Sequence, residues 1–327
     1  MRLHYCGPEP EPIGFLLLPR FAMVALFSAI EPLRIANRMA GRELFRWQLI
    51  SSDGAPVEAS NGMPLGVEMA LQQAPDFPSL AVCASFAPEV GLTPSLLAGL
   101  RERAARGGVL GGVDTGCVAL AAAGLLDGQT VTLHWESLPD FRRRFPTIDA
   151  VESLYEVDSR GFSCAGGSAA IDMALDLVRR RHGDALAARV NAQLVHARAR
   201  LPASRQRPGA PPHLPTELRR AIGLMEANLE SPLAIADLAQ RLALSWRGLE
   251  RLFLRYLQRS PRDHYLGLRL DHAHGLLLET PHRVLDIALA CGFASASSFT
   301  RAFRQRHGLT PSQLRRQQDQ AWLSNGA

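Results

Sequence analysis

Residues 231–256 read SPLAIADLAQRLALSWRGLERLFLRY, and residues 284–306 repeat the pattern as VLDIALACGFASASSFTRAFRQR. Asp237 recurs 49 positions later as Asp286, and after one inserted residue the offset becomes 50. At that offset apolar and basic positions coincide: Leu249, Arg251 and Phe253 match Phe299, Arg301 and Phe303. Each copy predicts a short helix, a tight turn and a second helix, which is the geometry of a helix-turn-helix.

The second helix of such a motif enters the major groove of DNA, and its exposed N-terminal positions meet the base edges. Arginine can donate twice to guanine, and glutamate accepts from cytosine. The base-reading candidates are Arg247, Glu250 and Arg251 in the first copy and Ala296, Ser297, Ser298 and Arg301 in the second. Arg304 and Arg306 are candidates for phosphate contacts. The alternatives are a solvated helix face for any single arginine and, for the whole repeat, a helical bundle with no role on DNA.

The segment between the two copies predicts a rigid connection. His264 to Leu278 reads as one helix, which at 1.5 Å per residue is about 22 Å long. A strut of that order can hold two recognition helices in successive major grooves, about 34 Å apart. Residues 214–327 carry 15 Arg against 10 acidic residues, whereas residues 1–213 carry 21 of each. A basic module behind a neutral one indicates a polyanionic partner.

A proline-rich segment divides the chain. Residues 200–216 read RLPASRQRPGAPPHLPT, with five prolines. Proline lacks an N–H and fixes φ, so this segment predicts a semi-extended linker. The predicted parts are a first domain at 1–199, the linker at 200–216, and an all-α domain with two helix-turn-helix motifs at 217–327.

The first domain alternates strands with helices. The expected strands lie at residues 13–18, 47–51, 80–83, 109–113, 131–133 and 151–157, and the expected helices at 22–39, 96–105, 117–126, 169–181 and 185–198. This alternation predicts an α/β domain whose mostly parallel sheet is covered on both faces. Ligands of such sheets bind at the carboxyl ends of strands, which points here to the residues after Leu18, Val82, Val113 and Leu133.

Composition and pattern exclude several classes of protein. The chain has no apolar run of about 18 residues, so we expect no membrane partner, and its N-terminus lacks an apolar signal core. Five scattered cysteines favour neither a disulfide framework nor a CxxC metal site. We therefore expect no metal and no cofactor, and a reducing cytoplasm as the compartment, with nucleoid association.

The C-terminal repeat resembles the DNA-binding domain of the AraC/XylS family over about residues 215–317. The most specific pieces are Gly292-Phe293 in the second turn and Gly308-Leu309-Thr310-Pro311 at the close. The resemblance implies a transcriptional regulator, most often an activator, with double-stranded DNA and RNA polymerase as partners.

Gly112-Val113-Asp114-Thr115-Gly116-Cys117 predicts a strand, a tight turn and a helix. It resembles the nucleophile elbow of the class I glutamine amidotransferase-like fold, a flavodoxin-like α/β fold, in its PfpI branch. There the elbow holds a cysteine just before a residue–glycine pair. Aligned on Gly116, that position is Asp114, and Cys117 lies one residue beyond the glycine. His134 therefore lacks a thiol to activate, so the Cys–His chemistry of thiol enzymes is missing.

The elbow can still form a ligand pocket. Its backbone N–H groups at a helix N-terminus suit a carboxylate, and acidic side chains with Trp135 suit a cation. The predicted ligand-binding residues are Glu31, Asp114, Thr115, His134, Trp135 and Glu136. The alternative is that His134 and Trp135 are packed structural residues and that Glu31 is solvated.

The whole chain resembles the GlxA-type subgroup of AraC regulators, which places an amidotransferase-like sensor before the paired motifs. The resemblance is carried by residues 27–47, 51–62, 114–128, 132–136 and 163–178, with Cys117 as a departure from an expected small apolar residue. It implies a non-enzymatic homodimer that responds to an inducer of the arginine, betaine or carnitine class. Two alternatives remain: a PfpI-like hydrolase or lyase carrying a DNA-binding domain, and a constitutive DNA-binding protein whose first domain only dimerises.

Overall fold

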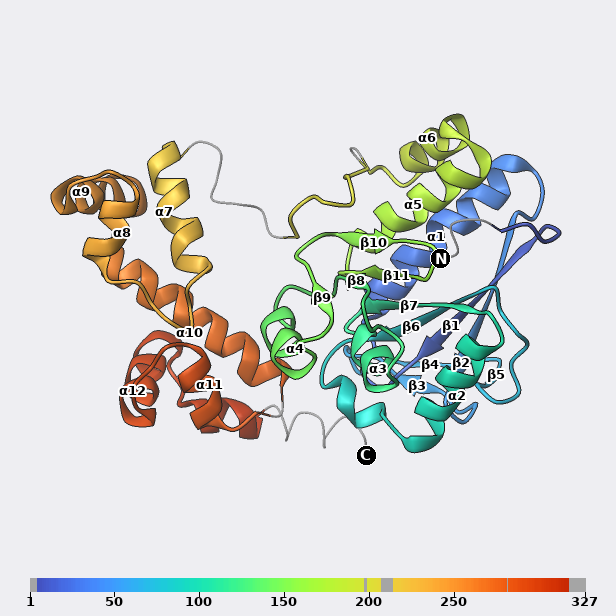
Figure 1. The fold of residues 1–327 in the computed structure, drawn as a ribbon, viewed down its shortest axis with the longest axis horizontal. Helices are drawn as coiled ribbons and strands as arrows, with labels where there is room; N and C mark the ends of the chain where they lie inside the picture. Colours follow the sequence, from blue (N-terminus) through green and yellow to red (C-terminus); the bar gives the residue numbers. More distant parts are fainter. Residues whose placement is uncertain (1–4, 197–198, 207–213, 281, 318–327) are drawn as a thin grey trace. The chain divides into compact units, whose positions relative to one another are not determined.

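The chain divides into two compact units, Met1–Gln206 and Arg207–Ala327 (Figure 1). The computed structural model describes residues 5–196, 199–206, 214–280 and 282–317. Unit 1 holds the expected sheet and unit 2 is helical, so the predicted fold class of each part is confirmed.

Unit 1 is built on a seven-stranded sheet. Its strands, in spatial order, are β10 (Tyr155–Val157), β11 (Gly161–Cys164), β7 (Val109–Asp114), β6 (Ser79–Ala84), β1 (Glu11–Leu17), β2 (Phe45–Ser51) and β5 (Met69–Ala70). Every neighbouring pair is parallel except β10 with β11. The carboxyl ends of β6, β7 and β11 therefore meet at one edge, where ligands of such sheets bind.

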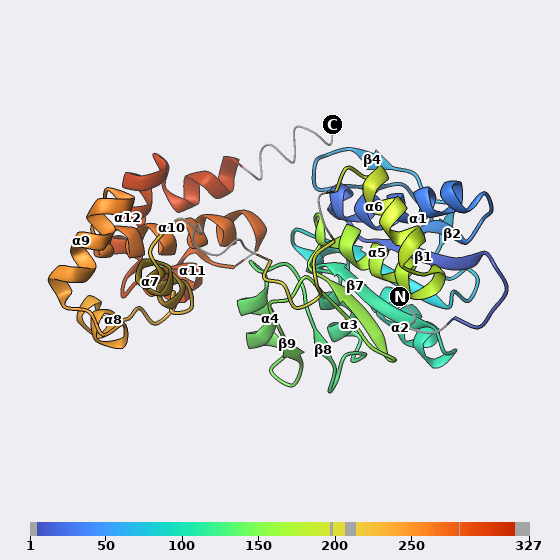
Figure 2. The ribbon, with the colours of Figure 1, turned by 90° about the horizontal axis from the view of Figure 1, so that it is seen from above.

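Helices cover both faces of the sheet (Figure 1, Figure 2). One face carries α1 (Met23–Ala40), α5 (Ala169–His182) and α6 (Asp184–Gln193), and the other carries α2 (Pro94–Ala105), α3 (Cys117–Ala122) and α4 (Leu138–Arg144). Phe15 packs into the first core and Leu16 into the second, because successive strand residues point to opposite faces. The short elements are the 3-10 helix η1 (Pro88–Gly91) and two small sheets, β3 (Val57–Glu58) with β4 (Pro64–Leu65) and β8 (Thr130–Val131) with β9 (Asp149–Ala150).

Three details of the predicted first domain are wrong. Strand β11 has no counterpart in the prediction, because Gly161–Cys164 is short and lacks an apolar run. The strand expected at 151–157 reduces to the antiparallel edge strand β10. The helix that begins at Cys117 ends at Ala122, and Gly124 soon after it adopts a φ of 72° that a helix does not allow.

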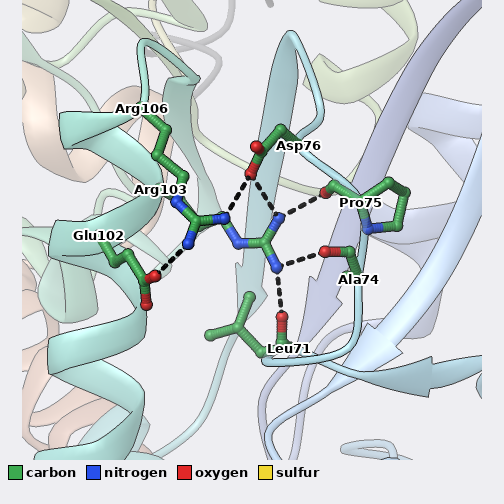
Figure 3. Close-up of polar contacts among 7 residues, drawn as sticks. All are labelled: Leu71, Ala74, Pro75, Asp76, Glu102, Arg103 and Arg106. Carbon is green, nitrogen blue, oxygen red and sulfur yellow. Dashed lines mark hydrogen bonds and ion pairs between the residues drawn. The ribbon is translucent and has the colours of Figure 1, made fainter.

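A buried arginine holds the connection that follows β5. Arg103 of α2 is 8% exposed and donates to the carbonyl oxygens of Leu71, Ala74 and Pro75 and to the Asp76 carboxylate (Figure 3). Those carbonyls end a chain segment away from any strand, so without the guanidinium they would lose hydrogen bonds on burial. Arg103 therefore has a structural role in closing the sheet edge.

Unit 2 consists of α7 (Thr216–Glu226), α8 (Ile235–Arg241), α9 (Trp246–Leu257), α10 (Pro261–Glu279), α11 (Val284–Ala290) and α12 (Ala296–His307). Its apolar residues form two clusters, one around α7, α8 and α9 and the other around α11 and α12. Helix α10 joins them: Tyr265 belongs to the first cluster, and Leu270 and Leu277 to the second. The predicted strut is thus confirmed but longer at its start, because Ser260 caps the helix and Pro261 occupies its first turn.

The linker is shorter than the predicted span of 200–216. Residues 200–206 form part of unit 1, and helix α7 begins at Thr216. The composition is that of a linker throughout, but Arg200 and Gln206 find hydrogen-bond partners on unit 1 that sequence alone does not reveal. The remaining predicted linker residues, 207–213, lie outside the described residues.

Candidate DNA interface and ligand site

The first helix-turn-helix joins α8 to α9. Ala243 in the turn adopts a φ of 55°, and the hydroxyl of Ser245 caps α9 by accepting the N–H of Gly248 at 3.1 Å. From α10, the Tyr265 hydroxyl donates to the Asn228 carbonyl at 2.6 Å and accepts from the N–H of Leu233 at 3.2 Å. The loop that leads into α8 is thereby fixed to the central helix.

The second helix-turn-helix joins α11 to α12 and is anchored differently. Gly292 has a φ of 72°, and a Cβ there would lie 2.6 Å from the Pro232 side chain, so glycine is required on both counts. From α10, Arg269 donates to the carbonyls of Cys291 and Gly292, both at 2.7 Å, with its guanidinium carbon 4.3 Å from the centre of the Phe293 ring. Helix α10 therefore holds one motif through a tyrosine and the other through an arginine.

The two recognition helices present the same positions to solvent. From Trp246 to Leu257 and from Ala296 to His307, exposed, half-buried and buried residues follow each other in the same order at an offset of 50. Among the predicted base-reading residues, those exposed are Arg247, Arg251, Ala296, Ser297 and Arg301, and those half-buried are Glu250 and Ser298. Leu249, Phe253, Phe299 and Phe303 are fully buried beneath them.

A hollow of about 860 Å³ lies along α12. Its lining residues are Ala296, Ser297, Thr300, Arg301, Arg304, Gln305 and Thr310. Three of the predicted base-reading residues are thus brought together on one concave surface with a predicted phosphate contact, Arg304. Thr300 and Gln305 were missed at the sequence stage of prediction, although the repeat pairs Thr300 with Glu250 at an offset of 50.

Two predicted contact residues already have protein partners. The Ser298 hydroxyl donates to the Ser295 carbonyl at 2.9 Å, and its N–H donates to the Ser295 hydroxyl at 3.2 Å, so Ser298 belongs to the N-cap of α12. Arg306 donates to both carboxylate oxygens of Asp271 at 2.5 and 2.6 Å. Its guanidinium therefore ties α12 to α10, which weakens its assignment to phosphate.

Asp114 ends β7 at the sheet edge predicted to bind ligand. Its φ is 61°, and it is 6% exposed. Burial, with a smaller contribution from the Glu136 carboxylate, raises the pKa of Asp114 to about 8, against hydrogen bonds from Ser85 and from the Thr115 backbone. Asp114 is therefore largely a neutral carboxylic acid at neutral pH.

Close backbone packing builds the turn around this carboxyl group. A Cβ on Gly116 would lie 1.9 Å from the Val82 carbonyl oxygen, and one on Gly166 would lie 2.8 Å from Asp114. The Thr115 hydroxyl donates to the Ser85 carbonyl at 2.6 Å. Ser85 and Gly166 were not among the predicted site residues, although each follows the end of a strand that flanks β7, which is the signal that would have found them.

The segment after β8 supplies the remaining predicted ligand residues. His134 Nδ1 lies 3.5 Å from a Glu136 carboxylate oxygen, and burial lowers the pKa of His134 while Glu136 raises it. Trp135 is half-buried against the second core, with its ring 5.7 Å from that of His134. Glu31 is set apart from this group: its carboxylate pairs with Arg34 on α1 at 2.7 Å and is 42% exposed.

The comparisons with known proteins agree with this architecture. The helix-turn-helix domain family matches residues 238–317. The chain is 44% identical to the HTH-type transcriptional regulator CdhR of Pseudomonas aeruginosa, over 92% of this chain and 90% of that protein. The chain belongs to the GlxA-type AraC transcriptional regulators. It is 34% identical to the HTH-type transcriptional regulator GlxA of Rhizobium meliloti, over 93% of this chain and 95% of that one.

A solved structure supports the assignment of unit 1 within this AraC-type regulator. An AraC family transcriptional regulator from Pseudomonas putida has 30% sequence identity and a TM-score of 0.53, covering 57% of this chain and all of that one. Within the part of the chain that the structure describes, no group of ligating side chains suits a metal ion. The described helices include none that is both long and apolar enough to cross a membrane.

The thiols of the regulator lie away from the elbow position. Cys117 is fully buried in α3, where its thiol contacts the Thr132 carbonyl at 3.5 Å. Burial raises the pKa of Cys117 to about 12 and likewise raises the pKa of Cys164 to about 12. A thiol that stays protonated is a poor nucleophile, so neither cysteine replaces the one that Asp114 supplants.

Proposed function

We propose that this AraC-type regulator binds operator DNA as a homodimer through α9 and α12 and activates transcription by recruiting RNA polymerase. It would act in the cytoplasm, on the nucleoid. The observation that carries the DNA part is the matching exposure of the two recognition helices, each of which presents arginine at the same position, Arg251 and Arg301. Both arginines are exposed on short helices capped by serine, so neither is needed inside a core.

The test of this interface is operator affinity. Arg251→Ala and Arg301→Ala should each lower affinity for the cognate operator by about 1–3 kcal/mol, because each removes a forked donor to guanine. Arg46→Ala, which removes one exposed arginine from unit 1, is the control for net charge and should leave affinity unchanged. An unaltered gel-shift titration for both recognition-helix variants would remove α9 and α12 from the interface.

We also propose that unit 1 binds a small amino-acid-like or quaternary-amine metabolite at the Asp114 edge. The support is a buried carboxyl group beside the α3 N-terminus, with Thr115, His134, Trp135 and Glu136 nearby. Trp135 would contact an ammonium group, and Asp114 would charge when a cation binds. Glu31 would join this site only after release from Arg34.

A thermal-shift experiment on the full chain tests the ligand site. L-arginine, glycine betaine and L-carnitine are the probes, and a bound probe should raise the unfolding midpoint by mass action. Asp114→Ala should abolish the shift and leave operator binding intact. If no probe shifts the midpoint, the proposed ligand class is wrong; if Asp114→Ala shifts as the wild type does, the site lies elsewhere.

An exposed apolar patch supports the proposal of a dimer. Val24, Phe27 and Met63 are 62%, 40% and 57% exposed. Asn61 contacts the Met23 sulfur at 3.8 Å and so brings the turn that carries Met63 against the start of α1. A contiguous exposed apolar surface indicates a protein contact. Phe27→Asp should shift sedimentation towards the monomer if this patch pairs two copies.

The enzymatic alternative has less support. The fold is that of a PfpI-like domain, yet the elbow carries Asp114 where the resemblance places a cysteine. We therefore propose that unit 1 binds its ligand without turning it over. A hydrolase screen that found turnover abolished by Asp114→Ala would overturn this.

A further inference from the structure

The last residue of unit 1 contacts the segment that carries the proposed ligand residues. Gln206 Nε2 points at three acceptors: the Thr132 hydroxyl at 3.1 Å, the Leu133 carbonyl at 2.9 Å and the Ser153 carbonyl at 2.8 Å. Thr132 and Leu133 directly precede His134 in the chain. A residue at the root of the linker thus forms part of the support behind the ligand site.

The same short segment also contacts the elbow. The Thr132 carbonyl accepts the Cys117 thiol at 3.5 Å, and the Thr132 N–H donates to the Ser163 hydroxyl at 2.8 Å. Cys117 opens α3, directly after the Asp114 turn, and Ser163 belongs to β11. Any shift of residues 132–133 is therefore felt both at the elbow and at Gln206.

Elsewhere the linker root is held by polar contacts instead of core packing. Arg200 donates to Asp172 through its backbone N–H at 2.7 Å and through its guanidinium at 2.7 and 3.0 Å, and Pro202 accepts the Leu154 N–H at 2.9 Å. Leu201 is 75% exposed, and a groove of about 460 Å³ separates this segment from α5 and α6. Hydrogen bonds at a surface exchange readily for bonds to water, so this attachment can release without unfolding the sheet.

Gln206 is also incompletely satisfied. Its Oε1 is buried and has no hydrogen-bond partner among the described residues. A buried unpaired acceptor opposes the attachment that Nε2 makes. The balance between attached and released states is therefore set by few contacts.

We propose that Gln206 is a positioning residue that couples the ligand segment, residues 132–136, to the linker. The attached root holds Thr132 and Leu133 in the arrangement that the ligand site requires. Ligand occupancy and root attachment then favour each other, because coupling between two sites is reciprocal. The ligand part rests on the proposed function, whereas the structural coupling does not.

Hydrogen–deuterium exchange on the full chain tests the coupling without a ligand. Gln206→Glu replaces the donor with a carboxylate that faces two carbonyl oxygens, so the root should detach. Exchange should rise at least about fivefold in residues 200–206 and also in residues 130–136. Gln72→Glu, which alters an exposed glutamine bonded to Ser95, is the matched control and should leave both segments as in the wild type. Faster exchange confined to residues 200–206, or in neither segment, would overturn the proposal.

A second arm uses the probe that raises the wild-type melting midpoint among L-arginine, glycine betaine and L-carnitine. That probe should slow exchange of residues 200–206 in the wild type, and its affinity should fall at least about tenfold in Gln206→Glu and be restored towards the wild-type value in Gln206→Asn or Gln206→His if a donor is recovered. Unchanged affinity in Gln206→Glu would overturn the coupling. A failure of every probe to bind would instead count against the proposed ligand class, and the exchange experiment would still decide the coupling.

Discussion

The two units place their chemistry at opposite ends of the scale of burial. In unit 2, Arg251 and Arg301 stand exposed on helices whose buried faces are made of leucine and phenylalanine. In unit 1, Asp114 is 6% exposed at the end of a central strand, and burial raises its pKa to about 8. An exposed donor can meet a macromolecule directly, whereas a buried acid interacts with a ligand small enough to reach it.

The difference also shows in what each site costs the fold. Exposed arginines leave the helix–helix packing of unit 2 undisturbed. The Asp114 turn needs a left-handed residue and glycines at 116 and 166, and it encloses an ionisable group. Strain and burial of this kind concentrate at functional sites.

The largest effect is expected where the two helix-turn-helix motifs differ in their turns. Gly292→Ala forces a Cβ into the Pro232 side chain at positive φ and should destabilise unit 2 by about 2–4 kcal/mol. Ala243→Gly, the matched change in the first turn, should alter stability by less than about 1 kcal/mol. Urea denaturation measures both. Equal effects of the two variants would show that the turns are equivalent despite the different anchors from α10.

The burial of Asp114 should make the stability of unit 1 depend on pH. An unfolded aspartate has a pKa of about 3.9, so between about pH 4 and pH 8 the unfolded chain binds fewer protons at this position than the folded one. The free energy of unfolding therefore falls as pH rises through this window. Asp114→Asn should raise it by roughly 2–4 kcal/mol at about pH 7.5 and by much less near pH 4. Urea denaturation at several pH values checks this, and a gain that did not change with pH would mean that Asp114 is ionised in the folded protein.

A smaller effect distinguishes the two recognition helices. Arg304 in α12 occupies the position of Leu254 in α9. If Arg304 contacts phosphate, Arg304→Ala should weaken binding to all sequences by about three- to tenfold and reduce the slope of log affinity against log salt by about 1. Leu254→Ala should leave that slope unchanged. Loss of affinity for the operator alone would instead assign Arg304 to base reading.

The smallest effect concerns the exposed acid of unit 1. Glu31 and Arg34 form a surface ion pair, so Glu31→Gln should change the free energy of unfolding by no more than about 0.5 kcal/mol. The readout that decides its role is the thermal shift with the probe that binds the wild type. An unchanged shift would leave Glu31 as a surface residue, and a lost shift would return it to the ligand site.

The repeat, the charge excess and the turn glycines determined the DNA-binding unit from sequence, because helix period and capping are local. The α/β class of unit 1 followed from the same local patterns. Tertiary structure decided which residues meet: Ser85 and Gly166 reach Asp114 only because β6 and β11 flank β7, and Gln206 reaches Thr132 across 74 positions of chain. Sheet order and long-range hydrogen bonds depend on contacts between distant segments, which no local pattern of residues encodes.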